Sequence, residues 1–357
     1  MIKKISKWQL VFLLLICRIF TLMTYVPVFS QNGGISLRLK AAVISVLIQA
    51  LLIIPLVLLE RDAPHKTVTE IIFDKNKVLG FIAAVLYLLF FISLCTGQVL
   101  HYVDFLSESF LNGRRLFPLA ALLLVCTYCA YCGTEGLARS SVVMIIPFIL
   151  MLAIMTAEAR NSFSINNFYN EKGTSGLFGA VMDDLARNGE IVAAAFLMKN
   201  VKDDFKCSVY WLLAAKLVVT SVVFALITGV LGDYANVTDY PFLAVGSLTE
   251  SGLFRQNGAL YLIIWTISAV ISISVFISII SGLSEEIMPE LKLKNTISAF
   301  AVFIVSAVFM YFKTDFSLVR NTICGGVAQC LLLAVIPFLA FMQDKFKNRK
   351  GQVRNEI

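Results

Sequence analysis

The chain has 357 residues, of which 59% are hydrophobic and only 15% are charged, and its formal net charge is +7. A soluble globular domain carries about 25% charged residues, so this chain lacks the polar surface that a water-soluble fold needs. The composition excludes a water-soluble domain and indicates an α-helical protein of the lipid bilayer, whose positive charge reflects basic cytoplasmic loops and not binding to nucleic acid.

Ten apolar segments follow one another along the chain. A helix needs about 20 residues to cross a hydrocarbon core of about 30 Å, and these segments have that length or come close to it. They predict an all-α membrane protein with about ten transmembrane helices, in a single polytopic domain at 1–357 that ends in a cytoplasmic tail at 343–357. The predicted spans are 8–31, 37–59, 78–101, 116–133, 140–158, 177–198, 208–231, 258–283, 296–312 and 319–342.

Basic residues are divided unequally between alternate loops. If the N-terminus is cytoplasmic, eighteen Lys and Arg residues fall on the cytoplasmic side and nine on the outer side. Because basic loops are retained inside, both termini are expected in the cytoplasm. The turn-rich segment 159–176 separates five spans from five, so the repeats at about 8–158 and about 177–342 would have opposite orientations, as in an inverted-repeat transporter.

The first span contains a charged residue deep in the helix, Arg18. A charge at the bilayer centre costs at least ~2.5–3.5 kcal/mol, so such a residue faces protein or water and is a functional candidate by default. Two interpretations of Arg18 stay open: a group that binds a ligand, or one half of a structural ion pair with a buried acid.

The sixth span is interrupted by polar residues. The stretch 183–190 lies between apolar residues, and Asn188-Gly189 within it is a turn signal. An interrupted span marks the binding site in many transporters, because its broken ends leave amides and carbonyls free for a carboxylate or an ammonium. The alternative is an outer loop at 183–190, but then about eight apolar residues would remain, too few to cross a membrane. The candidate ligand-binding residues are Arg18, Thr21, Arg187, Asn188, Gly189 and Glu190.

Two further spans carry polar residues on apolar helices. Lys216 in span seven is either a buried fixed cation that can exchange protons or a side chain that extends to the inner surface. Ser274 and Ser278 in span eight share a helix face, which fits a polar pathway or helix packing through small residues. Lys216, Ser274 and Ser278 therefore form a candidate ion or proton site.

Other chemistry is not indicated. Cys126, Cys129 and Cys132 have metal-like spacing, but they lie in an apolar helix without a partner histidine, so we expect no metal site. The sequence contains no phosphate-binding loop, zinc motif or nucleophile elbow. We therefore expect neither a cofactor nor an enzymatic activity.

Four short motifs stand at defined places in the chain. Ile5-Ser6-Lys7-Trp8-Gln9 enters span one, the segment 133–139 (Gly-Thr-Glu-Gly-Leu-Ala-Arg) lies between spans four and five, and Gly189-Glu190 lies in span six. Before and inside span eight come Tyr240-Pro241, Phe254-Arg255, Leu260, Trp265 and Ile273-Ser274. These motifs resemble those of the spore-germination permeases, the B subunits of germinant receptors, within the amino acid–polyamine–organocation transporter superfamily. The first is similar to the family's I-S-x-x-Q entry to span one, the second to its G-x-E-x-x-A-R loop, and the third to a Gly-Glu pair in its sixth span.

The resemblance implies an inverted five-helix repeat with discontinuous helices 1 and 6 around an amino-acid pocket. Phe20 and Leu22 stand where the family's first span has a Gly-x-Gly-like break. Because helices 1 and 6 are adjacent in that fold, we expect Arg18 to pair with Glu190.

The resemblance also implies a location and partners. It indicates the spore inner membrane, an A-type and a lipoprotein C-type receptor subunit, and a small-molecule germinant such as an amino acid. The leading hypothesis is a B-type receptor subunit that senses this nutrient through a transporter-like pocket. The alternatives are a proton-coupled amino acid or amine permease and a membrane scaffold without transport.

Overall fold

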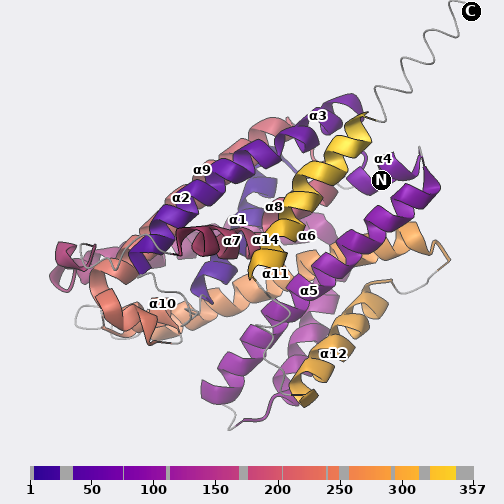
Figure 1. The fold of residues 1–357 in the computed structure, drawn as a ribbon. Coiled ribbons are helices and arrows are strands. Elements are labelled where there is room, and N and C mark those ends of the chain that lie inside the picture. Colours follow the sequence, from indigo (N-terminus) through magenta and orange to yellow (C-terminus); the bar gives the residue numbers. More distant parts are fainter. Residues whose placement is uncertain are drawn as a thin grey trace, which may run out of the picture.

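The computed structural model describes residues 4–24, 35–74, 76–109, 113–168, 176–202, 204–238, 240–248, 257–290, 294–312 and 322–342. Within these ranges the regular structure is helical, apart from an isolated bridge between Ile5 and Val201 (Figure 1). Seven stretches of the described chain are long and apolar enough to cross a membrane: Leu37–Asp62, Lys77–Ser107, Leu116–Asn161, Phe205–Asn236, Ala259–Ile287, Asn295–Phe312 and Gly325–Met342.

Within the described residues an all-helical fold with seven candidate membrane spans is therefore confirmed, while the total of ten spans and the inverted repeat stay predictions. The helices of the first half are α1 (Lys7–Met23), α2 (Ile35–Leu52), α3 (Ile54–Asp62), α4 (Val68–Phe73), α5 (Lys77–Ser109) and α6 (Leu116–Glu158), followed by the short turns η1 (Ala159–Asn161) and η2 (Ile165–Phe168). Those of the second half are α7 (Leu177–Ala186), α8 (Gly189–Leu197), η3 (Met198–Asn200), α9 (Phe205–Leu231), η4 (Gly232–Asn236), α10 (Pro241–Leu248), α11 (Asn257–Ile287), α12 (Lys294–Phe312), α14 (Thr322–Cys330) and the π-helical turn η5 (Leu331–Val335).

The start of α1 explains the first sequence motif in physical terms. The Gln9 amide N–H donates to the Ser6 hydroxyl at 3.3 Å, and the Ser6 N–H donates to the Gln9 side chain at 2.9 Å. This reciprocal capping box satisfies two backbone donors that a helix start leaves without partners. The preceding residue, Ile5, donates its N–H to the Asn200 carbonyl at 2.8 Å and accepts from the Lys202 N–H at 3.0 Å. The entry to α1 is thereby attached to the chain that follows α8.

The other end of α1 is held by α11. The Tyr261 hydroxyl donates to the Met23 carbonyl at 2.6 Å, and the Trp265 indole N–H donates to the Thr24 hydroxyl at 3.1 Å. The helix is unbroken from Lys7 to Met23, so the break expected near Phe20 and Leu22 is wrong for the described residues. Large side chains at these two positions favour a regular helix, and residues 25–31 of the predicted span lie outside the described chain.

The predicted spans 116–133 and 140–158 occur in one helical stretch, α6. Gly133, with φ 85° and ψ 165°, departs from helical geometry inside it, which is a backbone conformation that glycine tolerates best. The loop expected at 133–139 is therefore wrong beyond Gly133, because the following residues are already helical. Within this turn Glu135 accepts from Arg139 at 2.6 Å, an exposed pair one helical turn apart.

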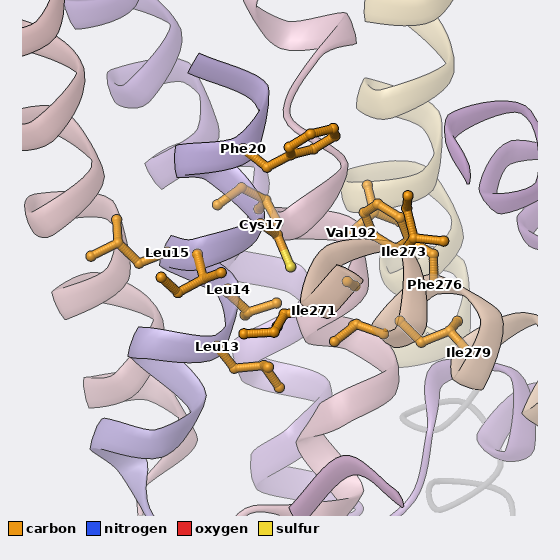
Figure 2. Packing of buried hydrophobic residues seen from close by; sticks show 14 of the residues in the cluster. Leu13, Leu14, Leu15, Cys17, Phe20, Val192, Ile271, Ile273, Phe276 and Ile279 are labelled. Atoms are coloured by element: carbon orange, nitrogen blue, oxygen red, sulfur yellow. The ribbon is translucent and has the colours of Figure 1, made fainter. Parts of the chain in front are cut away.

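Helix α1 occupies the interior of the molecule (Figure 1). From Leu10 to Met23 all of its residues except Phe12 and Thr21 are buried, which is typical of a helix surrounded by protein. Its side chains enter the main hydrophobic core together with those of α8 and α11 (Figure 2). Figure 2 labels the contributors: Leu13, Leu14, Leu15, Cys17 and Phe20 of α1, Val192 of α8, and Ile271, Ile273, Phe276 and Ile279 of α11.

Helix α14 approaches α7 very closely because of two adjacent glycines. A Cβ atom added at Gly325 would lie 2.8 Å from Ala186 Cβ, and one added at Gly326 would lie 2.7 Å from Met182 Cε. A side chain at Gly325 would require the helices to separate, whereas one at Gly326 would require the flexible Met182 side chain to move. This approach brings α14 against the end of α7, where the polar residues of span six are found.

Candidate functional site

The sixth predicted span consists of two helices, so the discontinuous-helix prediction is confirmed. Helix α7 ends at Ala186, Arg187 and Asn188 connect the two parts, and α8 begins at Gly189. The Gln329 side chain of α14 donates to the Asn188 carbonyl at 2.6 Å. This contact replaces one of the intrahelical hydrogen bonds that the break removes.

A buried polar network joins the break to α1 and α2. The Arg18 guanidinium donates through Nη2 to Asp184 Oδ1 at 2.7 Å and through Nη1 to Asn188 Oδ1. The Asn188 amide donates to Asp184 Oδ2 at 2.9 Å, and the Ser45 hydroxyl of α2 donates to the same oxygen. Arg18, Ser45 and Asn188 are almost fully buried. The Asp184 carboxylate is thus held by three side chains from three different segments.

The predicted pairing of Arg18 with Glu190 is wrong, although the expectation of a buried acidic partner is confirmed. Asp184 takes the place of Glu190 because it lies one turn before Asn188, so both side chains point toward Arg18. Glu190 comes after the break and meets a different cation.

That cation is Lys216 of α9, whose ammonium lies 3.3 Å from Glu190 Oε1. The same nitrogen donates to Gln49 Oε1 of α2 at 2.6 Å. All three side chains are buried, with at most 2% of any residue exposed. Lys216 therefore does not extend to the membrane surface, and its charge is neutralised inside the protein.

A third pair of contacts surrounds Asp183. Its carboxylate accepts from Arg38 Nη1 at 2.7 Å and from Arg187 Nε at 3.1 Å. Arg38 lies in the first turn of α2, whereas Arg187 is the first residue of the break. Asp183 and Asp184, adjacent in sequence, thus bind different cations: Asp183 binds Arg38 and Arg187, and Asp184 binds Arg18.

A cavity of about 440 Å³ lies beside the break. It is bounded by residues of α1, α5, α7 and α14, and it includes Thr21 and Arg187 from the predicted site. A second space of about 10 Å³, large enough for one water molecule, is lined by Arg18, Thr21, Arg38, Arg187 and both aspartates. Thr21 and Arg187 line both spaces and so connect the network with the cavity.

The remaining predicted residues lie behind the cavity wall. Arg18, Asn188 and Glu190 belong to the buried network and are not among the described residues that line the 440 Å³ cavity. Gly189 has a packing role, because a Cβ atom there would lie 2.2 Å from Leu94 Cδ1, and Leu94 is part of the cavity wall. The group that lies close to the Gly189 backbone is therefore the Leu94 side chain of α5.

The candidate ion or proton site at Lys216, Ser274 and Ser278 stays a prediction, and within the described residues its members make separate contacts. The Ser274 hydroxyl donates to the Val270 carbonyl of its own helix at 2.6 Å, and Ser278 is partly exposed. Lys216 contacts Glu190 and Gln49, so within the described residues its partners differ from those of Ser274.

Sequence reasoning missed Ser45, Gln49 and Gln329. All three are fully buried, and each contacts a residue of the sixth span or the lysine beside it. Each also stands in an apolar segment, and a polar residue among apolar neighbours was the available signal. Cavity residues Gln98 and His101 of α5 were missed as well. The Gln98 carbonyl oxygen accepts from the Ser272 hydroxyl at 2.8 Å.

Comparison with known proteins gives one family. The model of the family described as spore germination protein, Spore_permease, matches residues 4–317, which is most of the chain. No curated protein matches the chain.

Proposed function

The chain belongs to the spore germination protein family, and from this membership we propose that it is the B-type subunit of a germinant receptor. In this role it would sense a small nutrient, such as an amino acid, in the spore inner membrane. An A-type subunit and a lipoprotein C-type subunit would be its partners. The proposal starts from two findings: the chain belongs to a family of spore germination proteins, and its helices are long and apolar enough to cross a membrane.

The observation that carries the proposal is the 440 Å³ cavity at the break between α7 and α8. Ligand pockets for small molecules have volumes of roughly 300–1,000 Å³ and few polar groups, as this one does. Arg187 and Thr21 supply polar contacts at the point where the helix is interrupted. A nutrient bound there would contact residues of α1, α5, α7 and α14 at once.

The network behind the cavity suggests how binding is sensed. Arg187 contacts Asp183, its chain neighbour Asn188 contacts Arg18 and Asp184, and Gln329 holds the Asn188 carbonyl. A ligand that moves Arg187 would change the position of Asn188, to which α1 and α14 are attached. Because a ligand shifts an equilibrium only through its differential affinity for two states, these contacts are the ones that must differ between the resting and the activated receptor.

One observation favours the second candidate, a proton-coupled permease. Lys216 and Glu190 form an ion pair deep inside a membrane protein, and such pairs occur in proton relays of transporters. The two candidates require the same cavity, so binding alone does not separate them.

The test uses the full-length protein in lipid nanodiscs and in sealed vesicles. Melting midpoints are measured with a panel of amino acids, sugars and nucleosides. A receptor gives a stabilising shift with one nutrient class and no accumulation of that nutrient in vesicles under an imposed pH gradient. Accumulation that depends on the gradient would favour the permease, and no shift with any nutrient would contradict both. Loss of the nutrient response in spores carrying Arg187→Gln, at normal protein levels, would support the receptor role.

A further inference from the structure

We propose that the cavity beside the break recognises a carboxylate attached to an apolar body, so that the amino group of an amino acid is dispensable. The ligand class is then a small apolar monocarboxylate, with apolar amino acids included and amines or polyamines excluded. This inference rests on the proposed function and narrows it to a substrate class.

The first support is the apolar character of the cavity wall. Leu86, Leu89, Phe90 and Leu94 of α5 contribute to it, and Leu331 and Leu332 of η5 face the same space. Burial of apolar surface against such walls is favourable in proportion to its area, by roughly 25 cal/mol per Å². A ligand with an aliphatic or aromatic body gains this energy, whereas a sugar or a polyamine would leave polar groups facing hydrocarbon.

The second support is the sign of the charge at the cavity. Arg187 is the one formally charged residue among the described residues that line it, and no carboxylate is found among them. Its side chain is almost buried, and its Nε is fixed at 3.1 Å from Asp183 Oδ1. A guanidinium held in this way is suited to a carboxylate, because planar N–H groups form paired hydrogen bonds with two oxygens.

The third support is what an ammonium group would meet. The polar side chains of the described wall, apart from Arg187, are neutral hydroxyls, an amide and the imidazole of His101. The end of α7, where Ala186 lines the cavity, adds the partial negative charge of a helix C-terminus. These groups can accept hydrogen bonds from an amine but supply no full counter-charge, and an unpaired charge in a membrane interior is costly. The amine therefore adds little to binding, and a cation without a carboxylate is disfavoured.

The experiment compares three probes that share the same branched carbon chain. L-Leucine carries both charged groups, isocaproate lacks the amine, and isoamylamine lacks the carboxylate. Thermal shifts and equilibrium binding are measured for each on the full-length protein in nanodiscs. We expect isocaproate to bind at least as tightly as leucine, and isoamylamine to bind at least roughly ten-fold more weakly than isocaproate, the factor that corresponds to the loss of one charge-assisted contact.

Substitutions of Arg187 test whether its guanidinium binds the carboxylate. Arg187→Gln should weaken isocaproate binding by roughly ten- to hundred-fold, and Arg187→Lys should retain part of the affinity because it keeps the charge. Arg160→Gln, which removes an exposed arginine of η1, is the matched control and should leave binding unchanged.

Binding of isoamylamine equal to or tighter than that of isocaproate would overturn the inference, as would the absence of binding by both leucine and isocaproate. Retention of isocaproate affinity in a folded Arg187→Gln variant would also overturn it. A shift with some other nutrient in the panel described above would then leave the proposed function standing, so the two failures are distinguishable.

Discussion

The Arg18 guanidinium in α1 donates to the Asp184 carboxylate in the last turn of α7 across 2.7 Å, and both side chains are almost completely buried. This contact joins the central helix to the first half of the interrupted one. A buried ion pair contributes little net stability when it is intact, but removal of one partner leaves an uncompensated charge. The pair therefore makes the relative position of α1 and α7 difficult to change without a compensating contact.

We predict that Arg18→Gln and Asp184→Asn each lower the free energy of unfolding by about 3–5 kcal/mol. The double variant should lose less free energy of unfolding than the two single variants together, because neither charge is then left buried without a partner. The measurement is the melting midpoint in detergent, with the exposed pair of Arg139 and Glu135 as control. Glu135→Gln should cost about 0–1 kcal/mol. Additive losses in the double variant would argue against a direct pair.

The buried contact between Lys216 and Glu190 gives a second prediction. Lys216→Met removes a cation that two acceptors share, Glu190 and Gln49, and should cost about 3–5 kcal/mol because Glu190 stays buried. Addition of Glu190→Gln removes the remaining charge and should recover part of the loss. The fraction of protein that stays monodisperse after heating ranks the stabilities of the unaltered protein, Lys216→Met and the double variant. A double variant no more stable than Lys216→Met would contradict the pair.

Gly189 tests the packing of α8 against α5. A methyl group there would lie 2.2 Å from Leu94 Cδ1, so Gly189→Ala should cost about 1 kcal/mol, the low end for overpacking, because the Leu94 side chain can move toward the cavity that it borders. Leu94→Ala in the same chain should relieve that cost in part, since it removes the obstructing atoms. Gly282→Ala is the control, because no atom lies within 4 Å of its added Cβ and the position is helical. That change should be neutral or stabilising by about 0.4–1 kcal/mol. Equal melting midpoints for the two alanine variants would refute the packing argument.

The end of α1 supplies a fourth prediction. Tyr261→Phe removes the hydroxyl that donates to the Met23 carbonyl at 2.6 Å and leaves that carbonyl without this donor in a buried setting. The expected cost is about 1–3 kcal/mol. Tyr131→Phe removes an exposed hydroxyl that contacts Thr296 at 2.8 Å, and it should change the free energy of unfolding by less than about 0.5 kcal/mol. The melting midpoints of the two variants make the comparison. Similar effects from both changes would show that Tyr261 does not secure α1.

The orientation in the membrane remains a prediction from the bias of eighteen to nine basic residues. A C-terminal fusion to a reporter that is active only outside the membrane should be silent, while a cytoplasmic reporter at the same position should be active. The reverse pattern would overturn the assignment of both termini to the cytoplasm.

Local properties of the sequence determined much of this protein. The long apolar segments require helices in a bilayer, because in hydrocarbon every backbone polar group needs a partner within its own segment or a closed barrel. The polar residues around Asn188 and Gly189 placed the break in span six correctly, since a turn signal and a glycine act on the backbone nearby. Ser6 and Gln9 form a capping box for the same local reason.

Tertiary structure alone decided which residues meet at the site. Asp184 and not Glu190 pairs with Arg18, because helical phase on the two sides of the break sets the direction of each carboxylate. Gln49 and Gln329 reach the network from α2 and α14, more than a hundred residues away from their partners in the chain. A sequence pattern indicates that a charged residue is buried and that its burial is costly. The packing of the helices in three dimensions determines which partner offsets that cost.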